Sequence, residues 1–498
     1  MLKILLWCCL GDRSDDDVDI RDFAIAVDGT VNREWCRILD LTLEELKGLT
    51  RATISLPLKK GGLGCPTLKA TMATTYTASV MQTYQTMKAY APQLAECLAH
   101  SVSKDGHDEF GFNHNYRQVV DLWQWFDGSE DRGNAKVKVN QGPEDALMNG
   151  GKTAKKLSEN YYQRLHMEVQ TVRKTRSGDM SKKKGFRDKA KCDIARLASS
   201  GGPTAYYWLM IPPREVRTEI RFPKFKPHLF KIALRLRLGL PMEYKYRQGK
   251  CRCKSQGNNL DDYGRHLLGC KWGGWCDSRH DNLNRTILGM ARAAGNTAGE
   301  NATNAIPAYY EVTVDNEGET TTTATGVYVY ADGWITRTDG QQLLVDTGIT
   351  SVPRMKQLQA AQAYEDIKTS KYERHKRNVL AQEGHYPDLK VIPLIWETHG
   401  AAGTQTQQLI SNLQTQYREE VLPDRDQSAS SVFNSAWGFS ISTKLQIGNA
   451  EMIHNIVVGN RAYNSQTRRA KCSIRHDDQA AGERPHCSTC TCNAPLRM

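Results

Sequence analysis

Two aspartates flank a turn in the stretch YADGWITRTDGQQLLVD, and their spacing predicts a metal site. GVYVYADGWIT (326–336) and QQLLVD (341–346) alternate like strands, and the Thr338-Asp339-Gly340 loop between them is typical of a three-residue hairpin. Pairing across such a loop sets Asp332 directly opposite Asp346. Like charges in this position destabilise a sheet unless a cation offsets them, and magnesium takes carboxylate oxygens. The alternative is an ordinary exposed hairpin.

The next segment, 354–380, has the pattern of a helix. The residues that share one face at helical spacing are Ala361, Glu365, Lys368 and Tyr372. If this face packs on the hairpin, Lys368 would orient an attacking water and stabilise charge that develops on a phosphate. Lys371 is the competing candidate, and a surface position on a charged helix is the plain alternative for either lysine.

Further residues upstream could complete a catalytic group. Arg279 and His280 stand at the start of an expected helix, 281–294. Histidine changes its charge near neutral pH and therefore serves in acid–base chemistry, although a lone histidine is more often structural. Glu300 or Glu311 could supply an additional carboxylate.

The cysteines of CRCKSQGNNLDDYGRHLLGC predict a second metal site. Cys251, Cys253, His266 and Cys270 follow the spacing C-x-C-x12-H-x3-C. Three thiolates and one imidazole can close a tetrahedral zinc shell. The first two ligands are closer together than in the commonest zinc pattern, and Cys276 is a spare fifth candidate. Unligated cysteines with a capping histidine are the alternative.

The composition limits the class of protein. With 498 residues, 39% hydrophobic and 24% charged, the chain can bury a sizeable core in two or three domains. Its apolar opening, LKILLWCCL, is too short to cross a bilayer, so no membrane partner is expected. A net charge of +12 favours a polyanionic partner, because Lys and Arg release counterions from phosphate backbones. The scattered and C-x-C positions of the 14 cysteines favour reduced thiols and zinc ligands over disulfides.

Other segments surround these sites. Residues 1–135 are expected to be mostly helical, with a loop ISLPLKKGGLG (54–64) whose lysines could meet a phosphate or merely connect helices. The stretch 151–196 is basic and polar, which is typical of a solvated linker or a nucleic-acid contact. A further helix is expected over 228–238.

The order of these features resembles the C-terminal half of a non-long-terminal-repeat retrotransposon polyprotein of the site-specific type, over roughly residues 54–450. The GGLG loop, RLRLGLP, the CCHC cluster, the R-H-x helix start, an Asp pair and a K-x3-Y helix follow one another as in that family. HLLGCKWGGWCDSRHDNLNR resembles its zinc knuckle running into a restriction-like endonuclease. VIPLIWETHGAAG resembles a late strand and turn of the same nuclease.

The resemblance implies a PD-(D/E)XK fold, with a mixed sheet flanked by helices, that cuts DNA with magnesium or manganese. The residues to which it gives roles in the nuclease are Asp332, Asp346, Lys368, Tyr372, His280 and Arg279. Glu311 completes the catalytic candidates as the further carboxylate, which the resemblance itself does not assign. The two aspartates would bind the metal. The implied zinc ligands are Cys251, Cys253, His266 and Cys270.

The expected fold class is α+β and multidomain. Its parts are a helical reverse-transcriptase thumb-like region (1–135), a basic linker and helical segment (136–245), a CCHC zinc knuckle (246–276), a PD-(D/E)XK-type α/β endonuclease domain (277–455) and a cysteine-containing tail (456–498). The tail is expected to be disordered, and the alternative is a second zinc site made from Cys472, His486, Cys487, Cys490 and Cys492.

The sequence departs from the family in several places. Ala331 stands where proline is usual, Asp281 where asparagine is common, and Thr347-Gly348 follows Asp346, so the catalytic lysine must come from the helix. No Y-x-D-D or F-x-D-D motif occurs in the chain, and therefore no polymerase activity is expected.

The sequence thus predicts the endonuclease portion of a truncated retrotransposon protein. It would nick target DNA for target-primed reverse transcription by a polymerase supplied from elsewhere. Target DNA and the element RNA are the expected partners, Mg or Mn and Zn the expected cofactors, and the nucleus, otherwise the cytoplasm, the expected location. The alternative is a catalytically inactive remnant that binds nucleic acid.

Overall fold

The computed structural model describes the greater part of the chain. The described residues are 20–68, 80, 83–84, 86–102, 162–163, 165–167, 169–170, 184–212, 222–247, 250–253, 260–302, 306–314, 320–327, 329–351, 359–385, 389–421 and 427–477. They belong to two compact units, Met1–Leu197 and Ala198–Met498. The apolar opening, most of the basic stretch and the last tail cysteines lie outside the described residues.

Helices make up the regular structure that is described in the first unit. They are α2 (Ile20–Leu39), α3 (Leu43–Leu46), α4 (Leu49–Ser55), η1 (Leu58–Lys60), α6 (Pro92–Val102) and most of α10 (Lys184–Gly201). The glycine-rich loop folds back on itself, since a Cβ on Gly62 would come within 2.0 Å of the Leu56 carbonyl oxygen. Only glycine leaves room for this approach.

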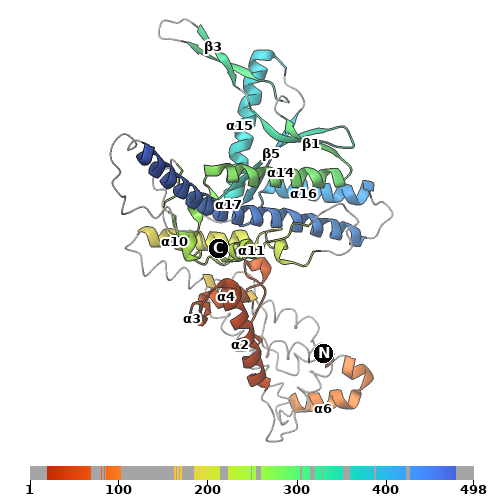
Figure 1. The fold of residues 1–498 in the computed structure, drawn as a ribbon. Coiled ribbons are helices and arrows are strands. Elements are labelled where there is room, and N and C mark those ends of the chain that lie inside the picture. Colours follow the sequence, from red (N-terminus) through yellow and green to blue (C-terminus); the bar gives the residue numbers. More distant parts are fainter. Residues whose placement is uncertain are drawn as a thin grey trace. The chain divides into compact units, whose positions relative to one another are not determined.

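A four-stranded mixed sheet lies in the second unit (Figure 1). Its strands, in spatial order, are β1 (Thr297–Ala302), β4 (Ala331–Thr336), β5 (Gln342–Thr350) and β6 (Lys390–Glu397). The first two neighbouring pairs are antiparallel and the β5–β6 pair is parallel. Because a parallel pair needs a crossover, α15 (Gln359–Glu383) connects its two strands. The fold class is therefore α+β, as predicted.

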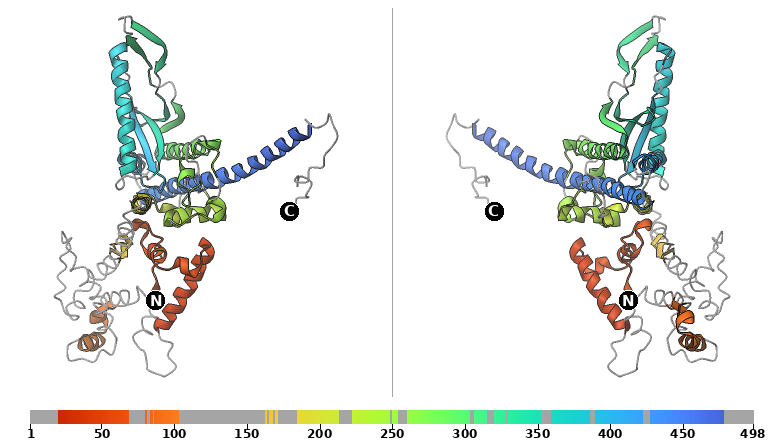
Figure 2. Two further views of the ribbon diagram at one scale, coloured as in Figure 1. Left: turned by 90° about the vertical axis from the view of Figure 1, so that its left-hand side faces the viewer. Right: turned by 90° about the vertical axis from the view of Figure 1, so that its right-hand side faces the viewer.

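Helices cover both faces of this sheet (Figure 2). On one face, Ile335, Leu343 and Val345 pack into a core with α14 (Trp275–Ala293), α16 (Thr404–Gln416) and α17 (Gln427–Asp477). On the other face, Leu344 packs with Tyr372 and Val379 of α15. The even-numbered residues of β4 and β5 thus share the side of α15.

A second core lies between short helices and the middle of α17. The elements concerned are α11 (Pro227–Leu238), α12 (Tyr244–Arg247), α13 (Arg265–Leu268) and η3 (Trp272–Gly274). The short helix η2 (Tyr207–Leu209) also contacts α17. Cys251 and Cys270 are buried in this core beside Ile453 of α17. The π-helical turn η4 (Tyr417–Val421) follows α16. Since α17 enters both cores, it joins the cysteine region to the sheet.

Three predicted boundaries differ from the structure. The stretch 326–336 is not one strand, because its first residues end β3 (Thr320–Val327), which pairs with β2 (Tyr309–Val314) in a separate two-stranded sheet. Strand-like alternation spans both pieces, so the pattern could not reveal the change of partner. α14 begins at Trp275 instead of 281, directly after left-handed Gly274. α17 continues past the expected boundary at 455.

Candidate active site and metal centre

The predicted hairpin register is confirmed. β4 pairs with β5 so that Gly333 lies opposite Val345, and Gly340 in the loop is left-handed with a φ of 84°. One more step along this register sets Asp332 opposite Asp346. Because side chains alternate along a strand, both carboxylates belong to the face that α15 covers.

His280 holds the first carboxylate from α14. Its Nε2 lies 3.0 Å from Asp332 Oδ2 and 3.0 Å from the Thr347 carbonyl oxygen, while its Nδ1 lies 3.1 Å from Asp281 Oδ1. The Thr347 N–H donates to the same Asp332 oxygen at 2.7 Å. The hydrogen bond to Asp332 is the main reason that the pKa of His280 is raised to about 9. The imidazole is therefore cationic at neutral pH.

Lys368 and Tyr372 of α15 hold the second carboxylate. The Lys368 ammonium donates to Asp346 Oδ1 and, at 3.1 Å, to the Thr347 carbonyl oxygen. The Tyr372 hydroxyl lies 2.6 Å from Asp346 Oδ2 and 2.9 Å from the Tyr330 carbonyl oxygen. The helix face expected from sequence therefore meets the hairpin. Lys371 is exposed, and its ammonium lies 5.8 Å from the centre of the Tyr372 ring.

The two carboxylates have opposite electrostatic environments. Burial alone would raise the pKa of Asp332, but the hydrogen bond and charge of His280 keep this pKa below its ordinary value. Burial raises the pKa of Asp346, which is only 8% exposed, although Lys368 and Tyr372 favour its charged form. A divalent cation between the two groups would offset the cost of burying the second charge.

The oxygen atoms gathered here suit a hard cation. Asp332 and Asp346 each offer carboxylate oxygens, and the Thr347 carbonyl oxygen lies between the cationic groups of His280 and Lys368. Carboxylate and carbonyl oxygens are the donors that magnesium takes in proteins, with water filling the remaining positions. The residues present therefore fit a magnesium or manganese ion.

Two supporting residues of this site are missing from the sequence-based prediction. Asn284 is buried, its Nδ2 donates to the Asp332 carbonyl oxygen at 3.0 Å, and its Oδ1 accepts from Thr347 Oγ1 at 3.0 Å. It stands four residues after His280, so both lie on one face of α14. This four-residue spacing could have indicated Asn284 from the sequence. The role of Thr347 depends on its backbone groups, which no side-chain pattern reveals.

Glu365 lies on the predicted face of α15 but does not join the carboxylate pair. Its carboxylate accepts from the N–H groups of Gln405 and Thr406 at 3.0 and 3.1 Å. These N–H groups belong to the first turn of α16, where they have no partner within the helix. The glycine before this helix makes room for the carboxylate, because a Cβ on Gly403 would lie 2.1 Å from Glu365 Oε1. Glu365 therefore fixes α15 against α16.

Arg279 and Glu300 contact other groups, and Glu311 belongs to a strand of another sheet. Arg279 is buried, and its guanidinium donates to Asn449 Oδ1 at 2.6 Å and to the Leu268 carbonyl oxygen at 3.2 Å. Glu300 lies 3.8 Å from Arg285 in an ion pair. Glu311 lies in β2, outside the four-stranded sheet. Arg279 thus ties α14 to α13 and α17, a role that only the tertiary packing shows.

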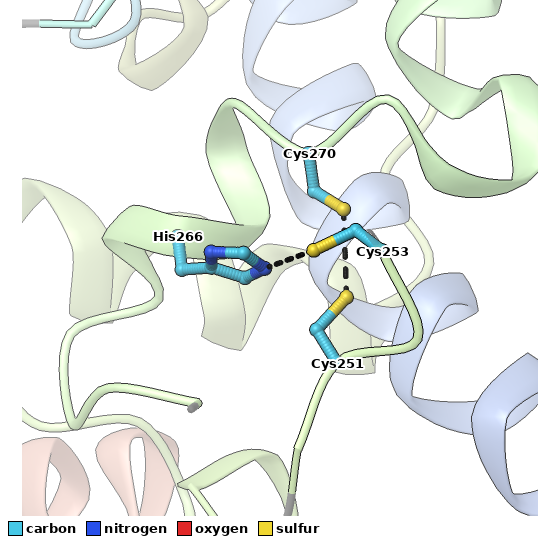
Figure 3. Close-up of side chains that lie close together, drawn as sticks. All are labelled: Cys251, Cys253, His266 and Cys270. Carbon is cyan, nitrogen blue, oxygen red and sulfur yellow. Dashed lines mark hydrogen bonds between the residues drawn. The ribbon is translucent and has the colours of Figure 1, made fainter. Parts of the chain in front are cut away.

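The second predicted site forms a Cys3His cluster (Figure 3). The ligand atoms of Cys251, Cys253, His266 and Cys270 all lie within 4.8 Å of one another. The Cys251 and Cys270 sulfurs are 3.4 Å apart, and Cys253 Sγ lies 3.3 Å from His266 Nε2. Such a cluster could bind zinc, which takes thiolate and imidazole ligands in tetrahedral geometry. Cys276 is outside the cluster, 4.0 Å from Arg279.

Backbone hydrogen bonds to Asp261 fix the turn that carries His266. Asp261 accepts from the N–H groups of Tyr263, Arg265 and His266 at 2.9, 3.1 and 2.8 Å. Burial raises the pKa of the Cys270 thiol to about 12. A bound cation would have to displace this proton, as zinc does when it binds cysteine.

Comparisons with known proteins leave the family open. A scan against protein-family models and a search of curated proteins find no match. Among the described residues, no helix is long and apolar enough to cross a membrane.

The raised pKa of His280 predicts a pH-dependent contribution to stability in metal-free protein. Protonated His280 stabilises the fold, so its contribution should be complete below its ordinary pKa of 6.5 and lost as the pH rises through about 9. The difference in thermal midpoint between wild type and His280→Gln, measured in zinc-loaded protein without magnesium or manganese, should therefore shrink across this range. His385→Gln, at an exposed histidine, is the control. A difference that stays constant with pH would contradict the prediction.

Proposed function

We propose that this chain is a metal-dependent DNA endonuclease of the PD-(D/E)XK type, with a zinc knuckle beside the nuclease domain. The observation that carries the proposal is the Asp332–Asp346 pair with the Lys368 ammonium and the Tyr372 hydroxyl on one carboxylate. The mixed sheet with helices on both faces supports it, since this is the architecture that the resemblance to site-specific retrotransposon proteins implies. The net charge of +12 suits a DNA substrate.

The reaction would be hydrolysis of a phosphodiester. Asp332, Asp346 and the Thr347 carbonyl would hold magnesium or manganese, which when bound supplies an activated water and charge stabilisation. Lys368 would orient the water and stabilise negative charge on the phosphate. Tyr372 holds Asp346 in position, and His280 keeps Asp332 ionised. The water gives up one proton to solvent as its oxygen adds to phosphorus. The phosphorus–oxygen bond to the leaving nucleotide breaks, and the leaving oxygen takes up a proton from solvent.

The proposed context is target-primed reverse transcription in the nucleus. The nick would give a primer end, and a separate polymerase would extend it, because the chain contains no Y-x-D-D or F-x-D-D motif. The element RNA would be a second partner. The zinc knuckle and basic residues would hold the target, since contacts to phosphates position a protein on DNA without reading its sequence.

The direct test is nicking of supercoiled plasmid by the purified full chain. We expect relaxation of the plasmid with magnesium or manganese, none when both ions are left out of the zinc-loaded protein, and recovery when either is added back. DNA binding without nicking, across both ions and several DNA sequences, would overturn the proposal and favour an inactive remnant that binds nucleic acid.

The two candidate lysines give a matched pair of variants. Lys368→Ala should slow nicking by about 10²–10³-fold, the typical cost of removing a donor that stabilises transition-state charge. Lys371→Ala should change the rate only a few-fold, because Lys371 is exposed and contacts the Tyr372 ring rather than a carboxylate. Initial rates at saturating plasmid and metal would measure both effects. Equal losses in the two variants would contradict the assignment of Lys368.

A further inference from the structure

Two exposed aromatic side chains flank the carboxylate that His280 holds. Tyr330 is 54% exposed and Trp334 is 37% exposed, two residues before and two residues after Asp332. Burial alternates from Val329 to Thr336, so Tyr330, Asp332 and Trp334 lie on the same side of the strand. At the rise of a β-strand, each ring is attached about 7 Å along the chain from the aspartate. A single exposed aromatic ring is ordinary on a protein surface, but these two stand on either side of a candidate metal-binding carboxylate.

The backbone around Trp334 is shaped to receive its ring. Gly299 of β1 lies directly opposite Trp334 in the sheet. A Cβ on this glycine would come within 2.8 Å of three indole atoms, Cε2, Cζ2 and Nε1. The indole therefore lies against the bare backbone of the edge strand, and only glycine permits this contact. Its exposed surface adjoins the catalytic face instead of entering the core.

Tyr330 is anchored to the site through its main chain. Its carbonyl oxygen accepts from the Tyr372 hydroxyl at 2.9 Å, and the same hydroxyl lies 2.6 Å from Asp346 Oδ2. The position of this residue is thereby linked to the second carboxylate.

We propose that Tyr330 and Trp334 bind the nucleotides on either side of the scissile phosphate by stacking on their bases, so that the DNA is unpaired where it is cut. This inference rests on the proposed endonuclease function. Exposed aromatic rings are the usual platforms for unpaired bases, because every base has a π-face. In a duplex the faces of the bases are covered by their neighbours, and an enzyme that needs them must take them out of the stack.

The test compares single-stranded oligo(dT), with 5-iododeoxyuridine at several positions, and the oligo(dA)·oligo(dT) duplex. Both are bound to the zinc-loaded full chain without magnesium or manganese, so that the result does not depend on cleavage. Irradiation of the single strand should cross-link it to peptides that contain Tyr330 or Trp334. Trp334→Leu should weaken binding of the single strand about tenfold, within the range for loss of one stacked base. Duplex binding should change little.

Conservative variants separate stacking from a structural role. Trp334→Phe keeps a flat ring and should stay close to wild type, whereas Trp334→Leu keeps only the apolar cover over Gly299. Tyr330→Leu should repeat the loss at the second position, and it keeps the test available if Trp334→Leu does not fold. Thermal midpoints of all variants would report whether the fold is intact.

The outcomes separate this inference from the proposed function. Cross-links confined to other peptides, absence of any cross-link, or equal losses for single strand and duplex would overturn the stacking role even if the protein nicks plasmid. Cross-links at the two rings in a protein that never nicks with magnesium or manganese would instead overturn the endonuclease proposal and leave the stacking contacts standing as a binding site.

Discussion

Replacing Asp332 and Asp346 together by asparagine is expected to abolish metal-dependent nicking, with a loss of about 10³-fold or more. Asparagine keeps the size of each side chain and its capacity to accept hydrogen bonds, but it removes both negative charges. A hard cation would then lack its charged ligands, and with it the activated water and the neutralisation of phosphate charge. DNA affinity without magnesium or manganese should be kept or increased, because the change removes negative charge.

Nicking rate and DNA affinity should be measured on the same preparation. Asp366→Asn is the matched control, since this exposed carboxylate lies on α15 one residue after Glu365 and accepts a hydrogen bond from Gln362. It should nick like wild type. If the double variant nicks at the wild-type rate, the hydrolysis must occur at another site or come from a contaminant.

The hairpin was predictable because its information is local. A three-residue loop with a glycine at its end fixes the register, and the period of two then fixes which side chains share a face. Asp332 and Asp346 follow from these two facts alone. Lys368 and Tyr372 follow from the helical period, because residues four apart lie on one face. The Cys3His cluster follows in the same way from short spacings.

The parts that sequence missed depend on contacts between distant segments. Arg279 was grouped with His280 because the two are adjacent, yet consecutive residues of a helix point in different directions. His280 reaches Asp332, while Arg279 turns toward Asn449 of α17, 170 positions along the chain. The break between β3 and β4 was missed for the same reason. Alternation of apolar residues indicates that a strand forms, but it does not indicate which strand it pairs with.

Replacing Cys270 by serine is expected to destabilise the second unit strongly and to reduce its zinc content to less than one ion per chain. Zinc binding contributes roughly 10–16 kcal/mol in small zinc fingers at neutral pH, and part of that energy would be lost with one thiolate. Cys270 and Cys251 are buried beside α17, so the loss occurs inside the second core. A fall in the thermal midpoint in zinc-loaded protein, together with metal analysis, would measure the effect.

Cys276→Ser supplies the matched control, because this cysteine is near the cluster but outside it. The control should keep its zinc and its midpoint, and Cys270→Ser that keeps one full equivalent of zinc would contradict the assignment of ligands. The effect should also reach the carboxylates. Arg279 donates to the carbonyl oxygen of Leu268, which stands two residues before Cys270. The next residue of α14 is His280, which hydrogen-bonds Asp332. If the segment around Cys270 unfolds, α14 should lose its hydrogen bond to Leu268. His280 should then be held less firmly against Asp332, and nicking should be slower.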